Sequence, residues 1–278
     1  MLNNKSALSR HAVDIQGSGD NVLIFSHGYG CDQSIWQPIL PLLGSTGRTV
    51  VYDITGAGAS DISHFDPRFR HSELDGYATD LIEICDELNA PRLTFIGHSV
   101  SAVIGLIAAS RRPTMFDSLI LIAPSPCHLN FTDYQGGFEK GQLDDLLELM
   151  NDNFSNWANT VTPIIMGYPD RPALTQELSG SFCRWNEGIA KHFARLTFLS
   201  DSRDVLSHVK NDCLIMQCEN DLIAPDFVGK YMSERLASST LVKLKTQGHC
   251  PHVSNPQETA ELINEYLRHG IERIPHVA

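Results

Sequence analysis

The chain has 278 residues, of which 42% are hydrophobic and 19% charged, and its formal net charge at pH 7 is −12. This length suits one large α/β domain or a core with an inserted subdomain, and the composition supplies enough apolar residues for a sizeable core. The acidic balance argues against nucleic acid and against an anionic membrane surface as partners, because both attract basic protein faces.

The N-terminal segment and the cysteines bear on the location of the protein. Residues 1–20 contain no apolar segment of signal-peptide length. The longest apolar run, Ala102 to Ala109, is far shorter than the roughly 20 residues of a membrane-spanning helix. The cysteines are odd in number and scattered: Cys31, Cys85, Cys127, Cys183, Cys213, Cys218 and Cys250. Without a secretory signal they indicate free thiols, so we expect a cytoplasmic protein.

Strand and helix patterns alternate along residues 1–126, which is typical of a mostly parallel sheet with helices on both faces. The helix patterns show apolar residues at helical spacing, and the strand patterns are short, continuous apolar runs. In chain order the sequence predicts a strand at Asn21–Ser26, a short helix at Ser34–Leu43, a strand at Arg48–Asp53, a helix at Leu74–Leu88, a strand at Arg92–Gly97, a helix at Ser99–Ser110 and a strand at Ser118–Ala123.

The alternation stops near Cys127 and resumes near residue 205. In between, no strand pattern is convincing, and helical patterns stand among breakers such as Gly136-Gly137 and Pro172. We interpret 127–204 as a helical insertion over the sheet, flanked by core segments 1–126 and 205–278. The insertion contains helical patterns at Leu143–Met150, Phe154–Val161 and Ile189–Leu199.

The second core segment repeats the strand and helix rhythm. It predicts a strand at Cys213–Cys218, a helix near Phe227–Leu236, a strand at Thr240–Lys245 and a closing helix at Pro256–Arg268. Asn255 stands where a helix N-cap is expected. The tail, residues 271–278, is expected to be loose.

The sequence Gly-His-Ser-Val-Ser at residues 97–101 joins a predicted strand to a helix of small residues. A serine at the apex of such a strand–turn–helix unit has its hydroxyl lifted out of the sheet, and it requires an acid and then a histidine downstream. Asp221 follows the strand Cys213–Cys218, and His249 follows the strand Thr240–Lys245. Ser99, Asp221 and His249 therefore occur in the required order at one edge of a parallel sheet.

These three residue types fit nucleophilic catalysis. A serine hydroxyl is a weak nucleophile, so His249 would accept the proton of Ser99 during attack. Asp221 would hold the imidazole in the correct tautomer. The oxyanion would be bound by the backbone N–H of Val100 and by that of Tyr29 in the loop after the first buried strand.

Other patterns compete with this interpretation. Ser101 stands where this motif usually has a second glycine, and either Asp201 or Asp204 could replace Asp221, although both lie in the insertion. Gly56-Ala57-Gly58 resembles a dinucleotide-binding loop but lacks the third glycine, so a tight turn is the better interpretation. A metal site built from His249, Cys250, His252 and Cys218 lacks paired C-x-x-C spacing. We expect neither a metal nor a cofactor.

Taken together, His27-Gly28, the elbow at Ser99, Asp221 and Gly248-His249 resemble the α/β-hydrolase superfamily along nearly the whole chain. Longer strings resemble one group within it, which contains the bacterial sigma-factor regulator RsbQ and the plant strigolactone and karrikin receptor hydrolases. These strings are Gly-His-Ser-Val-Ser-Ala at 97–102, Ser-Pro-Cys-His-Leu-Asn at 125–130, Tyr-Gln-Gly-Gly-Phe-Glu at 134–139, Ile-Ala-Pro at 223–225 and Gly-His-Cys-Pro-His at 248–252.

The resemblance implies an α/β-hydrolase fold with an inserted four-helix lid over a deep, mostly hydrophobic pocket. It assigns pocket-lining roles to His98, Trp157, Phe198 and Ile223, although His98 could equally pack without touching a ligand. Tyr29 departs from the phenylalanine that is frequent in these relatives, and it adds a hydroxyl to the pocket floor.

Two functions remain open on the sequence alone. The first is hydrolysis of a small hydrophobic ester or lactone through an acyl-enzyme on Ser99. The second is a ligand sensor, in which slow or single-turnover hydrolysis alters the lid and a regulatory protein such as a phosphatase binds. A coupling to stress or ligand signalling is implied by the resemblance and not by any residue of the chain.

Overall fold

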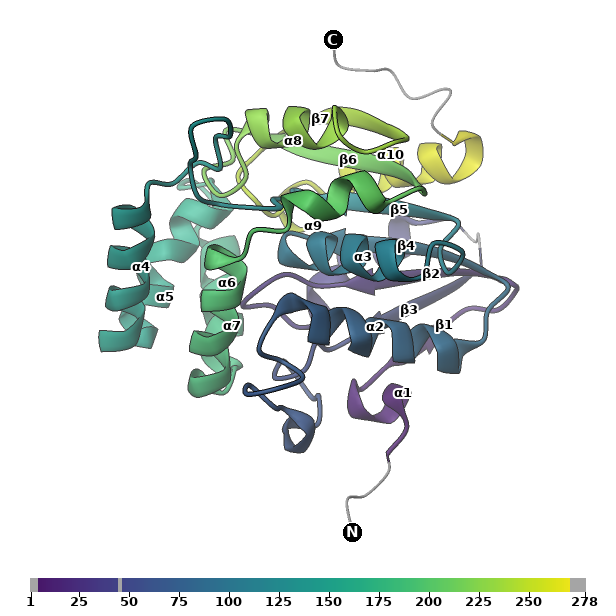
Figure 1. The fold of residues 1–278 in the computed structure, drawn as a ribbon, viewed down its shortest axis with the longest axis horizontal. Coiled ribbons are helices and arrows are strands. Elements are labelled where there is room, and N and C mark those ends of the chain that lie inside the picture. Colours follow the sequence, from purple (N-terminus) through teal and green to yellow (C-terminus); the bar gives the residue numbers. More distant parts are fainter. Residues whose placement is uncertain (1–4, 45–46, 271–278) are drawn as a thin grey trace.

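The computed structural model describes residues 5–44 and 47–270, so the tail expected to be loose, 271–278, lies outside the described residues. Seven strands form one sheet in the order β1-β3-β2-β4-β5-β6-β7 (Figure 1). Every neighbouring pair is parallel except β1 and β3, which are antiparallel. The strands are β1 (Asp14–Gln16), β2 (Asn21–Ser26), β3 (Arg48–Tyr52), β4 (Arg92–His98), β5 (Ser118–Ile122), β6 (Asp212–Glu219) and β7 (Ser239–Gln247).

Helices cover both faces of this sheet. In Figure 1, α2 (Leu74–Leu88) and α3 (Val100–Arg111) lie in front of the strands and pack against each other, while α10 (Pro256–His269) lies behind. The central strands are buried on both faces because helices lie on either side of them, which explains their continuous apolar sequences. The other core helices are α1 (Ala7–Arg10), η3 (Ile62–His64), η4 (Arg203–His208), α8 (Asp226–Ser233) and α9 (Pro251–Ser254).

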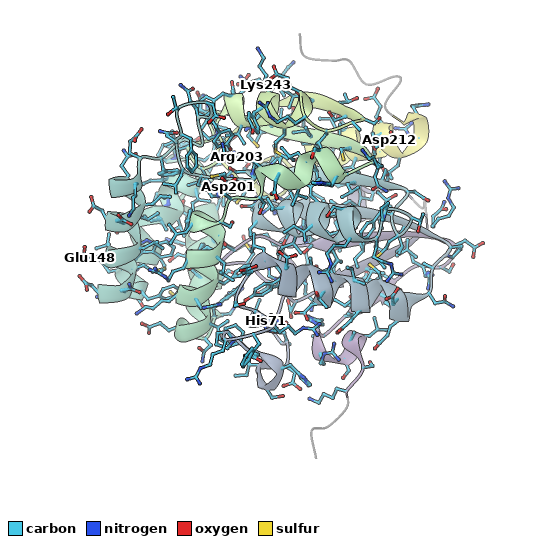
Figure 2. All side chains as sticks on the ribbon, in the orientation of Figure 1. His71, Glu148, Asp201, Arg203, Asp212 and Lys243 are labelled. Carbon is cyan, nitrogen blue, oxygen red and sulfur yellow. The ribbon has the colours of Figure 1, made fainter. Side chains whose placement is uncertain are left out.

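Four helices connect β5 to β6 and lie beside one end of the sheet (Figure 1): α4 (Lys140–Asp152), α5 (Phe154–Met166), α6 (Pro172–Arg184) and α7 (Glu187–Leu199). We call residues 127–204 the lid. Its two ends meet, because the N–H of Ser202 donates to the carbonyl of Pro126 at 2.9 Å and Cys127 forms an isolated antiparallel bridge with Asp201. Asp201 also pairs with Arg203 at 2.6 Å. Figure 2 shows Asp201 and Arg203 where the lid joins the core, and Glu148 on the outer side of α4.

Most predicted elements agree with the structure to within a few residues, but one predicted helix is divided and several elements of the structure have no prediction. The predicted helix at Ser34–Leu43 is two short 3-10 helices, η1 (Gln33–Trp36) and η2 (Leu40–Leu42), because Pro38 and Pro41 lack the N–H donors that a continuous helix needs. Helix α6 has no counterpart among the predicted elements, because Pro172 reads as a breaker in the sequence and is instead the first residue of this helix. Strand β1 has only exposed residues and therefore carries no apolar pattern.

Among residues 5–44 and 47–270, no helix is long and apolar enough to cross a membrane.

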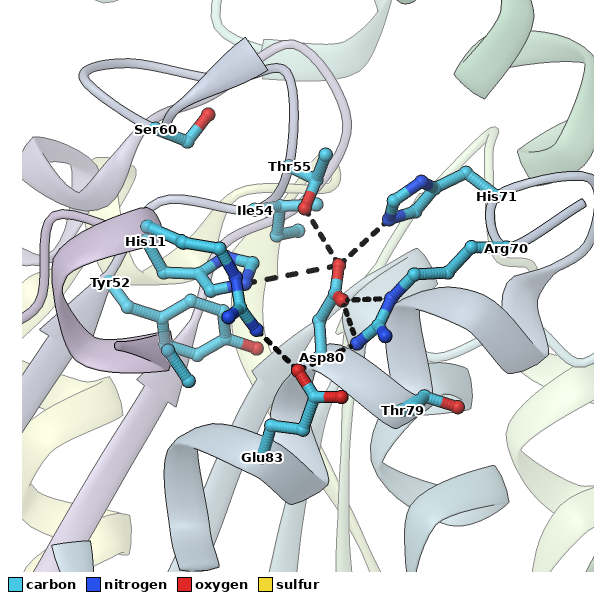
Figure 3. A network of polar contacts seen from close by, with 12 residues as sticks. His11, Tyr52, Ile54, Thr55, Ser60, Arg70, His71, Thr79, Asp80 and Glu83 are labelled. Carbon is cyan, nitrogen blue, oxygen red and sulfur yellow. Dashed lines mark hydrogen bonds and ion pairs between the residues drawn. The ribbon is translucent and has the colours of Figure 1, made fainter. Parts of the chain in front are cut away.

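A buried carboxylate ties the lid to the core (Figure 3). Asp80 of α2 accepts hydrogen bonds from Thr55 Oγ1 at 2.7 Å, His71 Nε2 at 2.9 Å and Arg70 Nε at 2.7 Å. The backbone carbonyl of His71 in turn contacts Nε2 of His192, on lid helix α7, at 2.6 Å. One ionised side chain thus holds together the loop after β3, the segment before α2 and the inner edge of the lid.

The ionisation of Asp80 is coupled to this network. Burial opposes the charge of Asp80, but the hydrogen bond from His71 and the charges of His11 and Arg70 outweigh burial and lower the pKa to about 2. Because the pKa is lower in the folded protein than the ordinary 3.8, Asp80 stabilises the fold above pH 5 and loses this contribution as the pH falls towards 2. At about 1.4 kcal/mol per pKa unit, the contribution is on the order of 2 kcal/mol.

We predict that Asp80→Asn lowers the free energy of unfolding at pH 7 by about 3 kcal/mol, because Arg70 loses its buried carboxylate partner and the donors of Thr55 and His71 lose a charged acceptor. The variant should also lose less stability than the wild type between pH 5 and pH 2. Urea unfolding followed by circular dichroism measures both effects.

Asp86→Asn is the matched control, because Asp86 lies on the same helix and pairs with Arg112 at 3.0 Å while more than half exposed. A surface pair of this kind contributes less than about 1 kcal/mol. Equal losses in the two variants would contradict the role given to Asp80.

Candidate active site

Ser99 lies at the sharp turn between β4 and α3. Its backbone has φ +56° and ψ −126°, a conformation that non-glycine residues rarely adopt. The turn is held by the N–H of Ser99, which donates to the carbonyl of Ile122 at 2.9 Å, and by close packing of helix on strand. An added Cβ at Gly105 of α3 would come within 2.1 Å of the Phe95 ring, so only glycine fits there. The packing therefore fixes the direction of the Ser99 side chain.

Ser101, which replaces the usual second glycine of the motif, is fully buried. Its hydroxyl donates to the backbone carbonyl of His27, at the end of the neighbouring strand β2. The substitution therefore adds a hydrogen bond between the first turn of α3 and the loop that carries Tyr29.

The side chains of Ser99, His249 and Asp221 form a continuous hydrogen-bonded chain. Nε2 of His249 lies 2.8 Å from Oγ of Ser99, and Nδ1 of His249 lies 2.8 Å from Oδ2 of Asp221. The other carboxylate oxygen of Asp221 accepts the N–H groups of Ile223 and Ala224 at 2.8 and 3.0 Å. Because a carboxylate only accepts, Nδ1 carries the proton, and Nε2 is left to accept the hydroxyl of Ser99.

The competing acids do not reach this chain. Asp201 is engaged by Arg203 at the base of the lid, and Asp204 lies in the exposed helix η4. Gly56 and Gly58 belong to a tight turn whose Ala59 N–H donates to Asp53 at 2.8 Å. Among the described residues, no group of three or more His, Cys, Asp or Glu is placed to hold a metal ion.

His98 both packs and lines the cavity. Its Nε2 donates to the backbone carbonyl of His249 at 2.8 Å, and its ring lies 5.0 Å from that of His249 and 4.5 Å from that of His252. Burial, followed by the neighbouring histidines, lowers the pKa of His98 well below its usual range, and burial lowers the pKa of His252 to about 3. Both rings are neutral at pH 7, so they support His249 without placing a charge beside it.

Two backbone N–H groups stand next to Ser99. Val100 is the first residue of α3, so its N–H has no acceptor within the helix. Tyr29 is the second residue of a turn closed by the N–H of Cys31 and the carbonyl of Gly28 at 3.3 Å, and such a turn does not use the N–H at this position. Both N–H groups are therefore candidate donors to an oxyanion.

The lid contacts both loops that flank Ser99. On one side, Nε1 of Trp185 donates to the carbonyl of Cys31 at 2.9 Å, and the ring of Phe182 covers Gly30, where an added Cβ would come within 2.2 Å of it. On the other side, the N–H of His249 donates to the carbonyl of Ile165, in α5, at 2.8 Å. The lid is therefore bonded to the oxyanion loop and to the histidine loop.

A small cavity adjoins Ser99. Its volume is about 30 Å³, far below the roughly 300–1,000 Å³ of an ordinary ligand pocket. Its lining is mostly apolar and consists of Tyr29, Cys31, His98, Ser99, Ile165, Leu178, Phe182, Thr197, Phe198, Ile223, His249 and Cys250. Of the expected pocket residues, His98, Phe198 and Ile223 line it, whereas Trp157 lies behind Tyr29 and Phe182.

Several lining residues were not predicted from the sequence. Cys31 and Cys250 directly follow the two active-site loops, and this adjacency was an available signal. Ile165, Leu178 and Thr197 come from three lid helices, and nothing in their spacing indicates which side chains face the core. The hydrogen bond from Trp185 to Cys31 joins residues 154 positions apart, so no local pattern of the sequence indicates it.

Comparison with known proteins agrees with the fold. The model of the alpha/beta hydrolase family matches residues 23–262. The chain belongs to this family, and it is a hydrolase.

Particular relatives cover nearly the whole chain. Strigolactone esterase RMS3 of Pisum sativum is 38% identical over 262 residues, 94% of each chain. Karrikin insensitive 2 receptor CA of Petunia hybrida is 36% identical, covering 94% of this chain and 97% of the receptor. The solved structure of the hydrolase olei00960 from Oleispira antarctica has a TM-score of 0.91 at 38% identity and covers 95% of this chain and 96% of its own.

We predict that Trp185→Phe lowers the free energy of unfolding by about 1 kcal/mol more than Trp157→Phe does. Both changes remove the same atoms from a buried ring. Only Trp185 loses a hydrogen bond, because Nε1 of Trp157 is buried without a partner among the described residues. Chemical denaturation of the two variants measures the difference, and equal losses would show that the bond between Trp185 and Cys31 contributes nothing.

Proposed function

We propose that the protein is a serine hydrolase that cleaves a small hydrophobic ester or lactone through an acyl-enzyme on Ser99. The observation that carries this proposal is the chain of two 2.8 Å contacts from Ser99 through His249 to Asp221. The mostly apolar lining of the adjoining cavity supports an uncharged substrate.

The acylation step uses each of these groups. Oγ of Ser99 attacks the substrate carbonyl carbon while its proton passes to Nε2 of His249, and Asp221 stabilises the imidazolium that forms. The carbonyl oxygen becomes an oxyanion, which the N–H groups of Tyr29 and Val100 bind. The tetrahedral intermediate then expels the alcohol, which takes the proton from His249, and an acyl ester remains on Ser99.

The deacylation step returns the enzyme to its first state. A water molecule gives a proton to His249 and attacks the acyl carbon, and the same two N–H groups bind the second oxyanion. The collapse of this intermediate releases the carboxylic acid and returns the proton to Ser99. For a lactone, the alcohol and the acid are parts of one product molecule.

A second function, ligand sensing with slow turnover, is favoured by a specific observation. The lid is hydrogen-bonded to both active-site loops, through Trp185 and through Ile165, and lid residues line the cavity beside Ser99, so a ligand held on Ser99 would contact the lid. Relatives at 36% and 38% identity are named receptor and esterase. A regulatory partner such as a phosphatase, and a cytoplasmic location, stay predictions.

We predict that Ser99→Ala lowers kcat for p-nitrophenyl acetate by at least about 10⁴-fold, and that Asp221→Asn lowers it by about 10⁴-fold, because the amide cannot hold His249 in the required tautomer. Release of p-nitrophenol at saturating substrate measures both. Asp201→Asn is the control and should retain wild-type kcat. Unchanged hydrolysis in Ser99→Ala would overturn the proposal.

The two functions differ in their behaviour after the first turnover. An enzyme releases p-nitrophenol linearly over many equivalents. A sensor releases about one equivalent in a burst and then stalls with an adduct, since deacylation is slow. We expect linear release, with the acyl group found on Ser99 by mass spectrometry after rapid acid quenching. A burst with a lasting adduct on Ser99 or His249 would favour the sensor.

A further inference from the structure

The side chain of Tyr29 lies inside the lid. Its backbone belongs to the oxyanion loop of the core, but its ring stands 5.1 Å from that of Phe182, 5.9 Å from Trp185 and 6.1 Å from Phe193, between ring centroids. The rings of Trp157 and Phe198 follow at 6.2 and 6.3 Å. The phenol is thus enclosed by five aromatic rings.

All four lid helices contribute to this enclosure. Met150 comes from α4, Trp157 from α5, Phe182 from α6, and Phe193 and Phe198 from α7. The hydroxyl of Tyr29 donates to the thioether of Met150 at 3.6 Å, a weak acceptor. Most of these contacts are edge-to-face, a favourable geometry for aromatic pairs.

Tyr29 therefore occupies the centre of the apolar chamber under the lid. What is left beside Ser99 is a cavity of about 30 Å³, which is small compared with ordinary ligand pockets of roughly 300–1,000 Å³. Tyr29, Phe182 and Phe198 all line this remaining cavity, and the rings of Phe182 and Phe198 also contact the phenol of Tyr29, so the volume filled by the phenol adjoins the cavity.

We propose that the side chain of Tyr29 is an internal plug that determines acyl-group specificity. With the phenol in the chamber, the site accepts an acyl group of acetyl size. A longer acyl group enters only after the ring leaves its contacts under the lid, and it then occupies the space that the ring vacated. This inference rests on the proposed hydrolysis at Ser99 and specifies the substrate class of that site.

If Tyr29 is a plug, kcat/KM should fall as the acyl group becomes longer, whereas it rises with acyl length in an open apolar pocket. In an open pocket, each added methylene contributes favourable burial, so kcat/KM rises with acyl length. Here a longer chain must first displace a ring held by five others, and that loss offsets the gain. Removing the phenol should restore the behaviour of the open pocket.

The test measures kcat/KM for p-nitrophenyl acetate, butyrate and hexanoate. In the wild type we expect kcat/KM for the hexanoate to be lower than kcat/KM for the acetate by a factor of about ten or more. In Tyr29→Ala, the ratio of hexanoate to acetate should rise about tenfold or more, and Tyr29→Leu should give an intermediate ratio. Tyr29→Phe keeps the ring and should keep the wild-type ratio. A wild type that prefers the hexanoate, or a ratio unchanged in Tyr29→Ala, would overturn the proposal.

Tyr77→Ala is the matched control. Tyr77, on α2, packs against Phe193 at 4.6 Å but does not line the cavity beside Ser99. Its loss loosens the same aromatic cluster without opening the chamber, so the wild-type ratio should persist, and a rise equal to that of Tyr29→Ala would overturn the plug. The wild-type profile alone tests the proposal if the alanine variants fail to fold.

The Ser99→Ala variant separates this inference from the proposed function. If Ser99→Ala still cleaves the acetate, hydrolysis at Ser99 fails, and the plug proposal that rests on it fails with it. If Ser99→Ala is inactive and the wild type prefers the hexanoate, the proposal of hydrolysis at Ser99 is supported and only the proposed role of Tyr29 is contradicted.

Discussion

The turn at Ser99 is the constraint on which the rest of the site depends. A non-glycine residue with φ +56° is strained by about 1–3 kcal/mol. The strain persists because α3 packs so closely on β4 that Gly105 has no room for a side chain against Phe95. The same packing exposes Oγ of Ser99 at the sheet edge and leaves the N–H of Val100 beside it. Since β4, β6 and β7 are parallel, the loops that carry Asp221 and His249 end at this edge as well.

The lid takes part in the geometry of the site in addition to covering it. Trp185 is bonded to Cys31, two residues after Tyr29, and Ile165 is bonded to His249. Neither contact reaches the reacting atoms, yet each fixes the backbone of a loop that does. The Asp80 network (Figure 3) includes His71. The backbone carbonyl of His71 contacts His192 of the lid, which adds a third connection on the side of α2. A displacement of the lid would therefore change the backbone positions of the loop that carries Tyr29, of the loop that carries His249 and of the segment before α2.

The sequence was most informative where a signal is local. The buried strands, α2 with its end at Asn89, and the elbow at Ser99 each carry an apolar run, a cap or a motif, and the chain order of Asp221 and His249 follows from the parallel sheet. It was least informative where distant segments meet. A proline such as Pro172 can either interrupt a helix or occupy its first position, and only the packing of the surrounding chain shows that it begins α6. The position of Trp157 behind Tyr29 depends on how four lid helices pack, which their periodicity does not specify.

Tyr29 illustrates why hydrolysis and sensing are difficult to separate in this fold. Its N–H belongs to the oxyanion hole that we propose, and its ring contacts side chains from all four lid helices. A ligand that displaces the ring must break the contacts between Tyr29 and the lid. Part of its interaction free energy is therefore used to change the conformation of the lid, and only the remainder appears as affinity. By the same argument, any partner that prefers the displaced lid strengthens ligand binding by an equal free energy. The residue that would limit the acyl group is thus also the residue through which occupancy would be transmitted to the surface, and a change of specificity at position 29 would alter both properties together.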